Sequence, residues 1–410
     1  MIFGSGAVFA LLFVSLYFEI FLLISFLQHR LSRGAHESDM GDHALPKVAI
    51  IVPCYNEEKA LGASLTSLLA LEYPRELLEI LIVDDGSTDR TLAVAQEFAG
   101  DSRVTILTKE NGGKHTAMNL GFAHTDAELV GCLDADSTVE SSALMNMVPL
   151  FINPNVAAVT PGIHVRHPST ALQHMQNVEY RLSLFNRFIL SSLGSAFITP
   201  GPFSIFRARV VRELGAWRYA HSTEDMEMAL RIQEAGYLIE NAPRAVVHTS
   251  TPATFGALYR QRVRWTYGGL RNAVDYRHMF GNYRYGNLGI IILPFAILSI
   301  FAGLYFFIRI IYYSGLSAYK AFLKYQYAGF HFDPSVPDPF YFNTSALLFL
   351  VIISTLLILV LITLGTFIGT GKRHPPISTP LFVIFYSFIV PLWLFAALFR
   401  AIFKTGVRWR

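Results

Sequence analysis

Four apolar runs limit what this chain can fold into, because each is long enough to cross a lipid bilayer. They cover residues 6–27, 288–312, 345–368 and 380–403, and about 250 residues of ordinary globular composition separate the first from the second. We therefore predict a transmembrane helix over 1–28, a linker over 29–46, a soluble domain with interfacial helices over 47–280, and a transmembrane region over 281–410.

The composition agrees with a membrane protein, since only 15% of the residues are charged where soluble domains have about 25%. A formal net charge of +3 is too small to indicate nucleic acid as a partner. Cys54 and Cys132 have neither a metal-binding spacing nor a disulfide framework, which favours a reducing compartment for the soluble block.

Basic residues beside the apolar runs predict the orientation in the membrane. No basic residue precedes the first run and no cleavage site follows it, so it is expected to be an anchor. His29, Arg30 and Arg33 follow it. The positive-inside rule then places the soluble domain in the cytoplasm of a plasma-membrane protein, with the N-terminus outside. Lys372 and Arg373 agree with four crossings, but the basic tail does not. Either the last run is re-entrant or interfacial, or the rule fails there.

Strands alternate with helices in the soluble block. The β-branched runs "KVAIIVPC", "LEILIVDD", "RVTILT" and "ELVGCLD" are each followed by polar residues, and helical spacing follows over 60–71 and 90–100. This order predicts βαβ units and a mostly parallel sheet, an α/β fold. Ligands bind such sheets beyond the carboxyl ends of the strands, where three acidic loops would meet.

The loop "LDADS" places two carboxylates, Asp134 and Asp136, one residue apart at a strand end. Hard oxygen ligands on a short loop suit Mg²⁺ or Mn²⁺ shared with substrate phosphates. A solvated acidic turn is the plainer interpretation of so short a motif.

The loop "VDDGSTD" ends another strand with Asp84 and Asp85. A carboxylate there can accept a hydrogen bond from a base N–H, which suits a nucleotide. The structural alternative is that Ser87 or Thr88 caps the helix that begins near Arg90.

Two further segments offer charged side chains. Lys114 follows two glycines, so it could neutralise a phosphate, although a flexible turn is an equal alternative and no Walker motif occurs. In "HSTEDMEM", Asp225 could serve as a general base. The alternative is that Ser222 or Thr223 caps a helix whose first turn holds Glu224 and Asp225.

Residues 171–193 and 255–274 are amphipathic and are expected to lie in the membrane interface. Arg260 and Arg262 in the second segment are expected to face lipid headgroups or the domain surface. The "RWR" at 408–410 is interpreted as an anchor, and Glu19 and Arg309 are the clearest charges inside apolar runs.

Six motifs in order, "PCYNEE", "VDDGSTD", "NGGKHTAMN", "DAD", "TED" and "QRVRW", resemble the processive family 2 glycosyltransferases. That family includes cellulose, chitin, hyaluronan and poly-N-acetylglucosamine synthases, and the likeness covers residues 46–275. The resemblance implies a cytosolic GT-A domain, a UDP-sugar donor, divalent metal, inversion at the anomeric carbon, and export of the glycan through the membrane helices.

Residue by residue, the resemblance implies two sets of roles. The uridine would be held by Tyr55, Glu57 and either Asp84 or Asp85, with Lys114 near the nucleotide and Asp134 and Asp136 on the metal. Acceptor chemistry would fall to Asp225 as base with Glu224 beside it, and to the motif residues Gln261, Arg264 and Trp265. There Arg264 would offset charge on the leaving diphosphate, and Trp265 would stack under the acceptor sugar.

The chain also departs from the family. It has Thr199 and Pro200 where relatives often have a cysteine-containing loop, which leaves the acceptor contacts open. Four spans are fewer than in many relatives that enclose a channel, so a homo-oligomer or an export partner stays a hypothesis.

The expected function is polymerisation of UDP-N-acetylglucosamine or UDP-glucose into a β-linked polysaccharide, with a growing glycan and membrane lipids as partners. The alternatives are transfer of one sugar to a membrane lipid, and a transporter or scaffold that only binds ligand. The "RWTYGG" run is more like poly-N-acetylglucosamine synthases than hyaluronan synthases.

Overall fold

The computed structural model describes residues 5–33, 44–329 and 346–403. Most of the predicted linker and the basic tail at 404–410, with its "RWR", lie outside these ranges. Four helical segments within them are long and apolar enough to cross a membrane: Gly6–His29, Leu288–Tyr327, Ala346–Thr370 and Thr379–Phe403.

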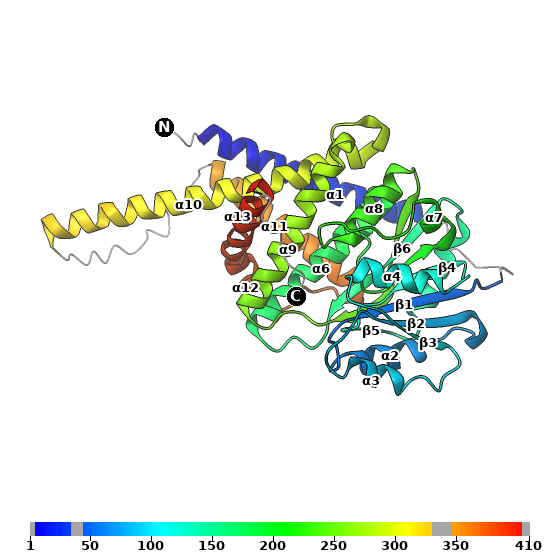
Figure 1. The fold of residues 1–410 in the computed structure, drawn as a ribbon. Helices are drawn as coiled ribbons and strands as arrows, with labels where there is room; N and C mark the ends of the chain where they lie inside the picture. Colours follow the sequence, from blue (N-terminus) through cyan, green and yellow to red (C-terminus); the bar gives the residue numbers. More distant parts are fainter. Residues whose placement is uncertain (1–4, 34–43, 330–345, 404–410) are drawn as a thin grey trace.

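The soluble domain is built on one eight-stranded sheet, in the order β3-β2-β1-β4-β7-β6-β8-β5. Figure 1 shows β1, β2 and β3 side by side in this sheet. Four of the seven neighbouring pairs are parallel: β2 with β3, β1 with β2, β1 with β4, and β6 with β8. The predicted mostly parallel sheet is confirmed. The strands are β1 Val48–Cys54, β2 Leu78–Asp84, β3 Val104–Thr108, β4 Leu129–Cys132, β5 Ser137–Val139, β6 Val156–Val165, β7 Ser204–Arg207 and β8 Leu238–Thr249.

Helices cover both faces of this sheet because its central strands are apolar on both sides. In β1, Ile50 and Val52 face a core with α2, α3 and α5, while Ala49 and Ile51 face one with α4, α7 and α8. The helices are α2 Leu61–Leu69, α3 Thr91–Gln96, α4 Lys114–Ala123, α5 Ala143–Met147, α7 Ala208–Glu213 and α8 Glu224–Glu234.

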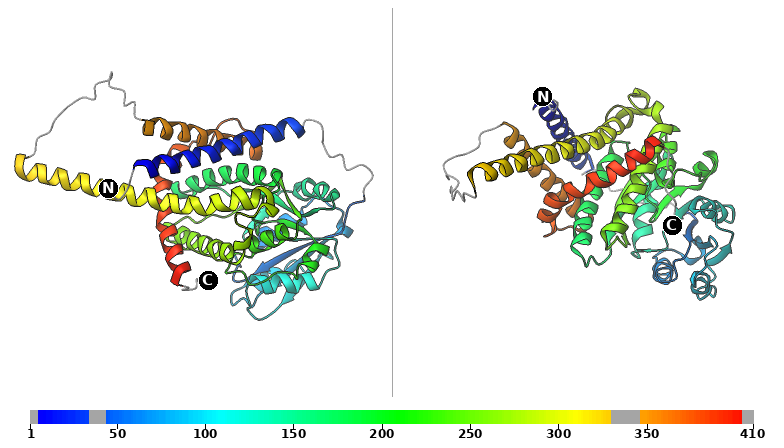
Figure 2. Two further views of the ribbon diagram at one scale, coloured as in Figure 1. Left: turned by 90° about the horizontal axis from the view of Figure 1, so that it is seen from above. Right: turned by 60° about the vertical axis from the view of Figure 1, so that its left-hand side comes forward.

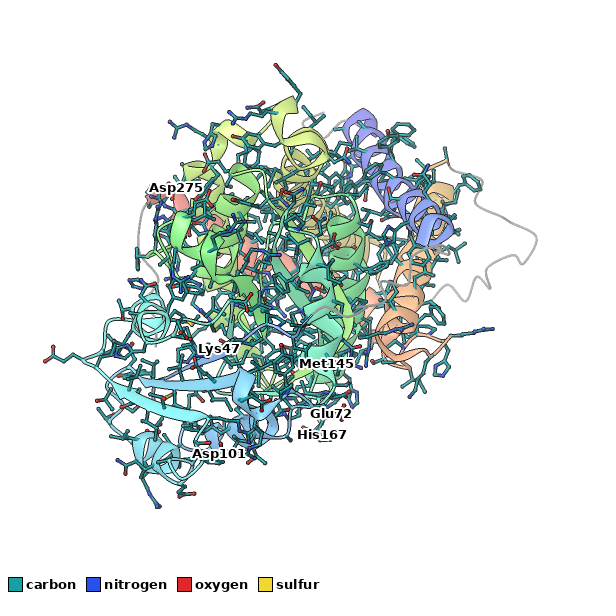
Figure 3. The ribbon with its side chains drawn as sticks, turned by 90° about the vertical axis from the view of Figure 1, so that its right-hand side faces the viewer. Lys47, Glu72, Asp101, Met145, His167 and Asp275 are labelled. Carbon is teal, nitrogen blue, oxygen red and sulfur yellow. The ribbon has the colours of Figure 1, made fainter. Side chains whose placement is uncertain are left out.

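A layer of helices joins this domain to the membrane helices. It consists of α6 (Ala171–Ser192), α9 (Phe255–Asp275) and the C-terminal segment 379–403, and we call it the interface layer. The amphipathic segments predicted at 171–193 and 255–274 correspond to α6 and α9. Figure 3 shows side chains filling the domain between Asp101, beyond the outer strands, and Asp275, the last residue of α9.

The other three candidate membrane helices are α1 (Ser5–Arg33), α10 (Leu293–Ala328) and α11 (Ala346–Thr370). Figures 1 and 2 show these three running in similar directions, with α10 projecting well beyond the others. The helix itself continues beyond the predicted span end at residue 312, to Ala328, because the residues that follow favour helix.

The C-terminal segment takes a different course. It comprises α12 (Thr379–Leu381), a π-helical turn (Phe382–Tyr386) and α13 (Ser387–Phe403). In Figures 1 and 2 (left view), α13 crosses the direction of α1 and α10, and it packs on α9. The last apolar run therefore does not lie alongside the other three.

Candidate active site

The loops that follow β1, β2 and β4 meet at one edge of the sheet, which we call the carboxyl edge (residues 55–58, 84–90 and 133–136). Cys54 at the end of β1 lies opposite Asp84 at the end of β2, so the polar residues that follow each strand are neighbours. The predicted convergence of the acidic loops follows from this register.

The loops after β1 and β2 are tied together by short hydrogen bonds. The Asn56 N–H donates to Ser87 Oγ at 3.0 Å, the Thr88 N–H donates to Asn56 Oδ1 at 2.8 Å, and the Glu57 N–H donates to Thr91 Oγ1 at 2.7 Å. Tyr55 lies half-buried beside them.

Ser87 and Thr88 therefore serve the loop and do not cap α3, so the capping alternative was wrong. At the start of α3, the Thr91 N–H instead donates a hydrogen bond to Asp89 Oδ1 at 2.9 Å, because that carboxylate lies nearer to the helix.

Asp84 and Asp85 are both buried, but their carboxylates have different surroundings. Asp85 accepts hydrogen bonds from Lys109 Nζ at 2.6 Å, from the Gly112 N–H at 3.1 Å and from the Gly113 N–H at 2.8 Å. Asp84 accepts only a 3.3 Å bond from the Ser87 N–H among those that the structure gives it. Asp85 thus holds the glycine loop that precedes Lys114, and Asp84 is the less committed of the two.

Lys114, the first residue of α4, forms an ion pair with Asp134. Burial lowers the pKa of Lys114 and the Asp134 carboxylate raises it, and the net pKa lies above its ordinary value. A Cβ on Gly201 would lie 2.5 Å from Lys114 Nζ and 2.8 Å from both oxygens of Asp134. The "PGPF" backbone therefore closes directly over this pair, and a side chain at position 201 would have to displace it.

Asp136 lies beside Asp134 and accepts a hydrogen bond from Ser137 Oγ at 3.2 Å. Burial, and then the charge of Asp134, raise the pKa of Asp136. Two crowded carboxylates of this kind fit a divalent cation that takes its remaining ligands from a diphosphate. The described residues contain no cluster of three or more acidic, histidine or cysteine side chains that would cage a metal alone.

Asp225 lies in the first turn of α8, and Thr199 fixes its backbone position. The Thr199 N–H and Oγ1 both donate to the Asp225 carbonyl oxygen, at 3.1 and 2.8 Å. Burial raises the pKa of Asp225 to about 6, against the opposing charge of Lys114. Thr199, which stands where relatives often have a cysteine-containing loop, therefore positions Asp225.

The loop before α8 is strained, and it is not capped as predicted. Thr223 occupies the N-cap position, but its side chain accepts no capping bond; Thr223 Oγ1 donates to the Ala220 carbonyl and accepts from Asn272 Nδ2 at 3.0 Å. His221 and Ser222 both have positive φ values of 52° and 66°. Such conformations persist where surrounding contacts enforce them, and here the contact comes from α9.

Gly268 of α9 is the point of that contact. A Cβ at Gly268 would lie 2.4 Å from Thr223 Oγ1 and 2.9 Å from the His221 carbonyl oxygen. Gly269 differs, since a Cβ there would meet Met226 Sδ at an ordinary 3.6 Å. The first glycine of "RWTYGG" therefore lets α9 reach the loop that carries Glu224 and Asp225.

The predicted motif residues lie on α9 near this contact. Gln261 has a buried Oε1 atom that accepts no hydrogen bond from the described residues, which suits a ligand hydroxyl. Trp265 is 37% exposed and Arg264 is half-buried. Gly268, on the same helix, is the point at which α9 reaches the loop before α8.

Arg262 does not face headgroups or the domain surface, so that prediction was wrong. Only 8% of Arg262 is exposed; its Nη2 is 2.7 Å from Glu179 Oε2 of α6, and its guanidinium lies 4.5 Å from the Trp265 ring centroid. Tyr386, in the π-helical turn, donates to the same Glu179 oxygen at 2.7 Å. Burial of α9 against α6 turned this arginine inward, where only a carboxylate could compensate its charge.

Tyr180 links this network to the carboxyl edge. Burial raises the pKa of its phenol, which lies within electrostatic reach of both Arg262 and Asp136. Sequence reasoning did not find Glu179, Tyr180 or Tyr386, because only tertiary packing brings them together; the amphipathic pattern of α6 was the one available signal.

Comparison with known proteins gives consistent matches. The family model described as "Glycosyltransferase like family 2" matches residues 46–268. A poly-β-1,6-N-acetyl-D-glucosamine synthase of Staphylococcus epidermidis is 32% identical over 309 residues, which are 75% of this chain and 72% of that protein. One of Staphylococcus aureus (strain COL) is 30% identical over 268 residues, covering 63% of this chain and 64% of that one.

A solved structure confirms the fold. A Pyrobaculum calidifontis mannosyltransferase, solved in complex with GDP-Man and Mn²⁺, aligns with a TM-score of 0.54 and 18% identity. The alignment covers 97% of this chain and 100% of that one. The predicted GT-A-like architecture is therefore borne out along almost the whole chain.

Proposed function

Because the chain belongs to the family 2 glycosyltransferases, we propose that it is an inverting, processive membrane enzyme that polymerises N-acetylglucosamine from UDP-N-acetylglucosamine. The observation that carries this proposal is the meeting of Lys114, Asp134, Asp136 and Asp225 at one edge of the sheet, beside α9. The names of the relatives favour a β-1,6 linkage and favour this sugar over glucose.

We assign the donor side to the carboxyl edge. Tyr55 and Glu57, with Asp84, would line the uridine, and Asp85 would act by shaping the 109–113 loop. Asp134 and Asp136 would hold Mg²⁺ or Mn²⁺, which when bound neutralises charge on the diphosphate. Lys114 already neutralises Asp134 and is placed to do the same for a phosphate oxygen.

We assign the acceptor side to α8 and α9. The acceptor hydroxyl oxygen bonds to C1 of the donor sugar from the face opposite the diphosphate, as the C1–O bond breaks and UDP departs with its electron pair. Asp225 takes the hydroxyl proton, with Glu224 beside it, and Arg264 supplies positive charge as the diphosphate leaves. Gln261 and Trp265 would hold the acceptor sugar, since sugars pack well on aromatic faces.

We propose the following arrangement in the membrane: the catalytic domain in the cytoplasm of the plasma membrane, the N-terminus outside, α1, α10 and α11 crossing, and α13 in the interface. Glu19 fits a structural role in it, because its carboxylate accepts hydrogen bonds from Ser354 of α11 at 3.1 Å and so joins α1 to α11. We further propose that the enzyme exports the glycan through the membrane, either alone or together with further subunits.

The deciding experiment measures product size. Membranes that contain the protein are incubated with labelled UDP-N-acetylglucosamine or UDP-glucose and Mg²⁺ or Mn²⁺, and the products are run on a gel. We expect a long polymer from the first donor, abolished by EDTA. A single sugar on a lipid would show non-processive transfer instead, and product from UDP-glucose alone would overturn the choice of sugar.

A further inference from the structure

A basic pocket lies between α6 and the C-terminal end of α11, away from the carboxyl edge. It has a volume of about 160 Å³. Its polar lining comes from three segments: Asn177 and Arg181 of α6, Thr366 and Thr370 of α11, and Lys372 and His374 of the loop that follows. The lining therefore offers three basic side chains and no acidic one.

Close packing builds the walls of this pocket. A Cβ on Gly365 would lie 1.9 Å from the Arg181 carbonyl oxygen, and one on Gly369 would lie 2.6 Å from Leu184 Cδ1. This small-xxx-small spacing lets α11 approach α6 closely, as it does between membrane helices. Ser378 Oγ donates to the His174 carbonyl oxygen at 3.1 Å and holds the loop against α6 on the other side.

The charges in the pocket are not neutralised within the described residues. Arg181 Nη1 lies 2.6 Å from His164 Nδ1, an imidazole and not a carboxylate. The ion pairs of the described ranges include none formed by Arg181, Lys372 or His374. Arg181 keeps unused N–H donors in a planar fork, the geometry that suits a phosphate.

The hydroxyl groups contribute less. Thr366 Oγ1 donates to the Ile362 carbonyl and Thr370 Oγ1 to the Thr366 carbonyl, both at 2.8 Å, so neither is free to donate to a ligand. Recognition would rest on Arg181, Lys372 and His374, with the Asn177 amide as the neutral donor.

The position of the pocket selects its ligands. Thr370 is the last residue of an apolar helix long enough to cross a membrane, and Lys372 follows two residues later. In the proposed orientation this is the depth of the cytoplasmic headgroups, where basic pockets between helices bind anionic lipids. We propose that the pocket binds a phosphate group, supplied by an anionic phospholipid headgroup or by a free phosphate compound from the cytosol.

Such a ligand would act on α6. Arg181 lies two residues from Glu179, which pairs with Arg262, and next to Tyr180, which lies within electrostatic reach of Arg262 and Asp136. A bound phosphate would therefore fix the helix that joins the membrane region to the acceptor side.

The test uses the purified full-length protein in detergent, with two probes: phosphatidylglycerol, compared with phosphatidylcholine, and inorganic phosphate. Lipid retention is measured by native mass spectrometry, and phosphate binding by the shift in thermal unfolding. The variants are the loop pair Lys372→Gln with His374→Gln, and Arg181→Gln. The matched control is Arg373→Gln, a neighbouring exposed cation that does not line the pocket.

We expect the loop pair to weaken binding of the preferred probe about tenfold or more, since charged hydrogen bonds are lost, and Arg373→Gln to leave it within about twofold. Retention of phosphatidylglycerol alone identifies a lipid headgroup, and binding of inorganic phosphate alone identifies a free compound. The loop pair carries the result if Arg181→Gln fails to fold. Equal loss in the control, or no binding of either probe, would overturn the proposal.

Discussion

The carboxyl edge and the interface layer hold their functional side chains in different ways. At the carboxyl edge, Asp85 is fixed by Lys109 and by two glycine N–H groups less than thirty residues away in sequence. In the interface layer, Arg262 is fixed by Glu179 and Tyr386, which lie 83 residues before and more than a hundred after it. The first region is organised by its own loops, whereas the second forms only once helices from three parts of the chain have packed.

This difference separates chemistry from assembly. A substitution at the carboxyl edge, or of the proposed general base Asp225, should change turnover with little change in stability. A substitution in the interface layer should first lower stability. Substitutions in the two regions should therefore be distinguishable by measuring turnover and stability separately.

The largest effect is expected for Asp225→Asn. An amide cannot accept the acceptor proton, so kcat should fall by about 10²- to 10⁴-fold. Binding of the donor, measured by calorimetry with UDP, should be unchanged because the carboxyl edge is intact. Glu234→Gln, at the other end of α8, is the control and should retain full turnover. Normal polymer yield from the Asn variant would remove Asp225 as the base.

Arg262→Met should act mainly on stability. Removing one partner of a buried pair leaves Glu179 uncompensated, and the free energy of unfolding should fall by about 3 kcal/mol. Arg260→Met, an exposed neighbour, should change it by less than about 0.5 kcal/mol. Thermal unfolding in detergent measures both. Equal effects at the two positions would mean that Arg262 does face the surface.

Gly268→Ala tests the contact that connects the two regions. The added methyl group would meet Thr223 and His221, and overpacking of this kind costs about 1–3 kcal/mol. Because that loop leads into Asp225, kcat should fall as well. Gly269→Ala meets no close atom and should be neutral or stabilising, since alanine favours helices. If the two variants have the same stability and the same kcat, Gly268 does not make the contact that connects the two regions.

The smallest effect is the pH dependence of turnover. Asp225 must be ionised to act as a base, and burial raises its pKa to about 6, so kcat should fall about tenfold per pH unit below 6. The free energy of unfolding should depend on pH in the opposite direction to kcat. The folded pKa exceeds the unfolded value, so this group lowers the free energy of unfolding as pH rises from about 4 to about 6. In the Asn variant that stability change should disappear, which a pH series of unfolding curves can measure.

The comparison also explains what the sequence could predict. Strand ends, acidic loops and motif order are local, so the α/β fold and the residues of the carboxyl edge could be found from spacing alone. The inward turn of Arg262 could not be found, because an amphipathic helix with several arginines does not reveal which of them meets a carboxylate 83 residues away. The capping alternatives at Ser87 or Thr88 and at Thr223 failed for a related reason: tertiary partners, Asn56 and Asn272, compete for those hydroxyl groups.

The length of α10 has a consequence for work on intact cells. Its 36 residues span about 54 Å, more than the roughly 30 Å of hydrocarbon. The Arg309 guanidinium lies 4.7 Å from the Tyr313 ring centroid, beside Tyr312, and we propose that these side chains mark the far lipid surface, where aromatic and basic side chains gather. In the proposed orientation the last turns stand clear of the lipid outside the cell and carry two exposed amines, Lys320 and Lys324. If that orientation holds, impermeant amine-reactive reagents would reach these two side chains from outside intact cells.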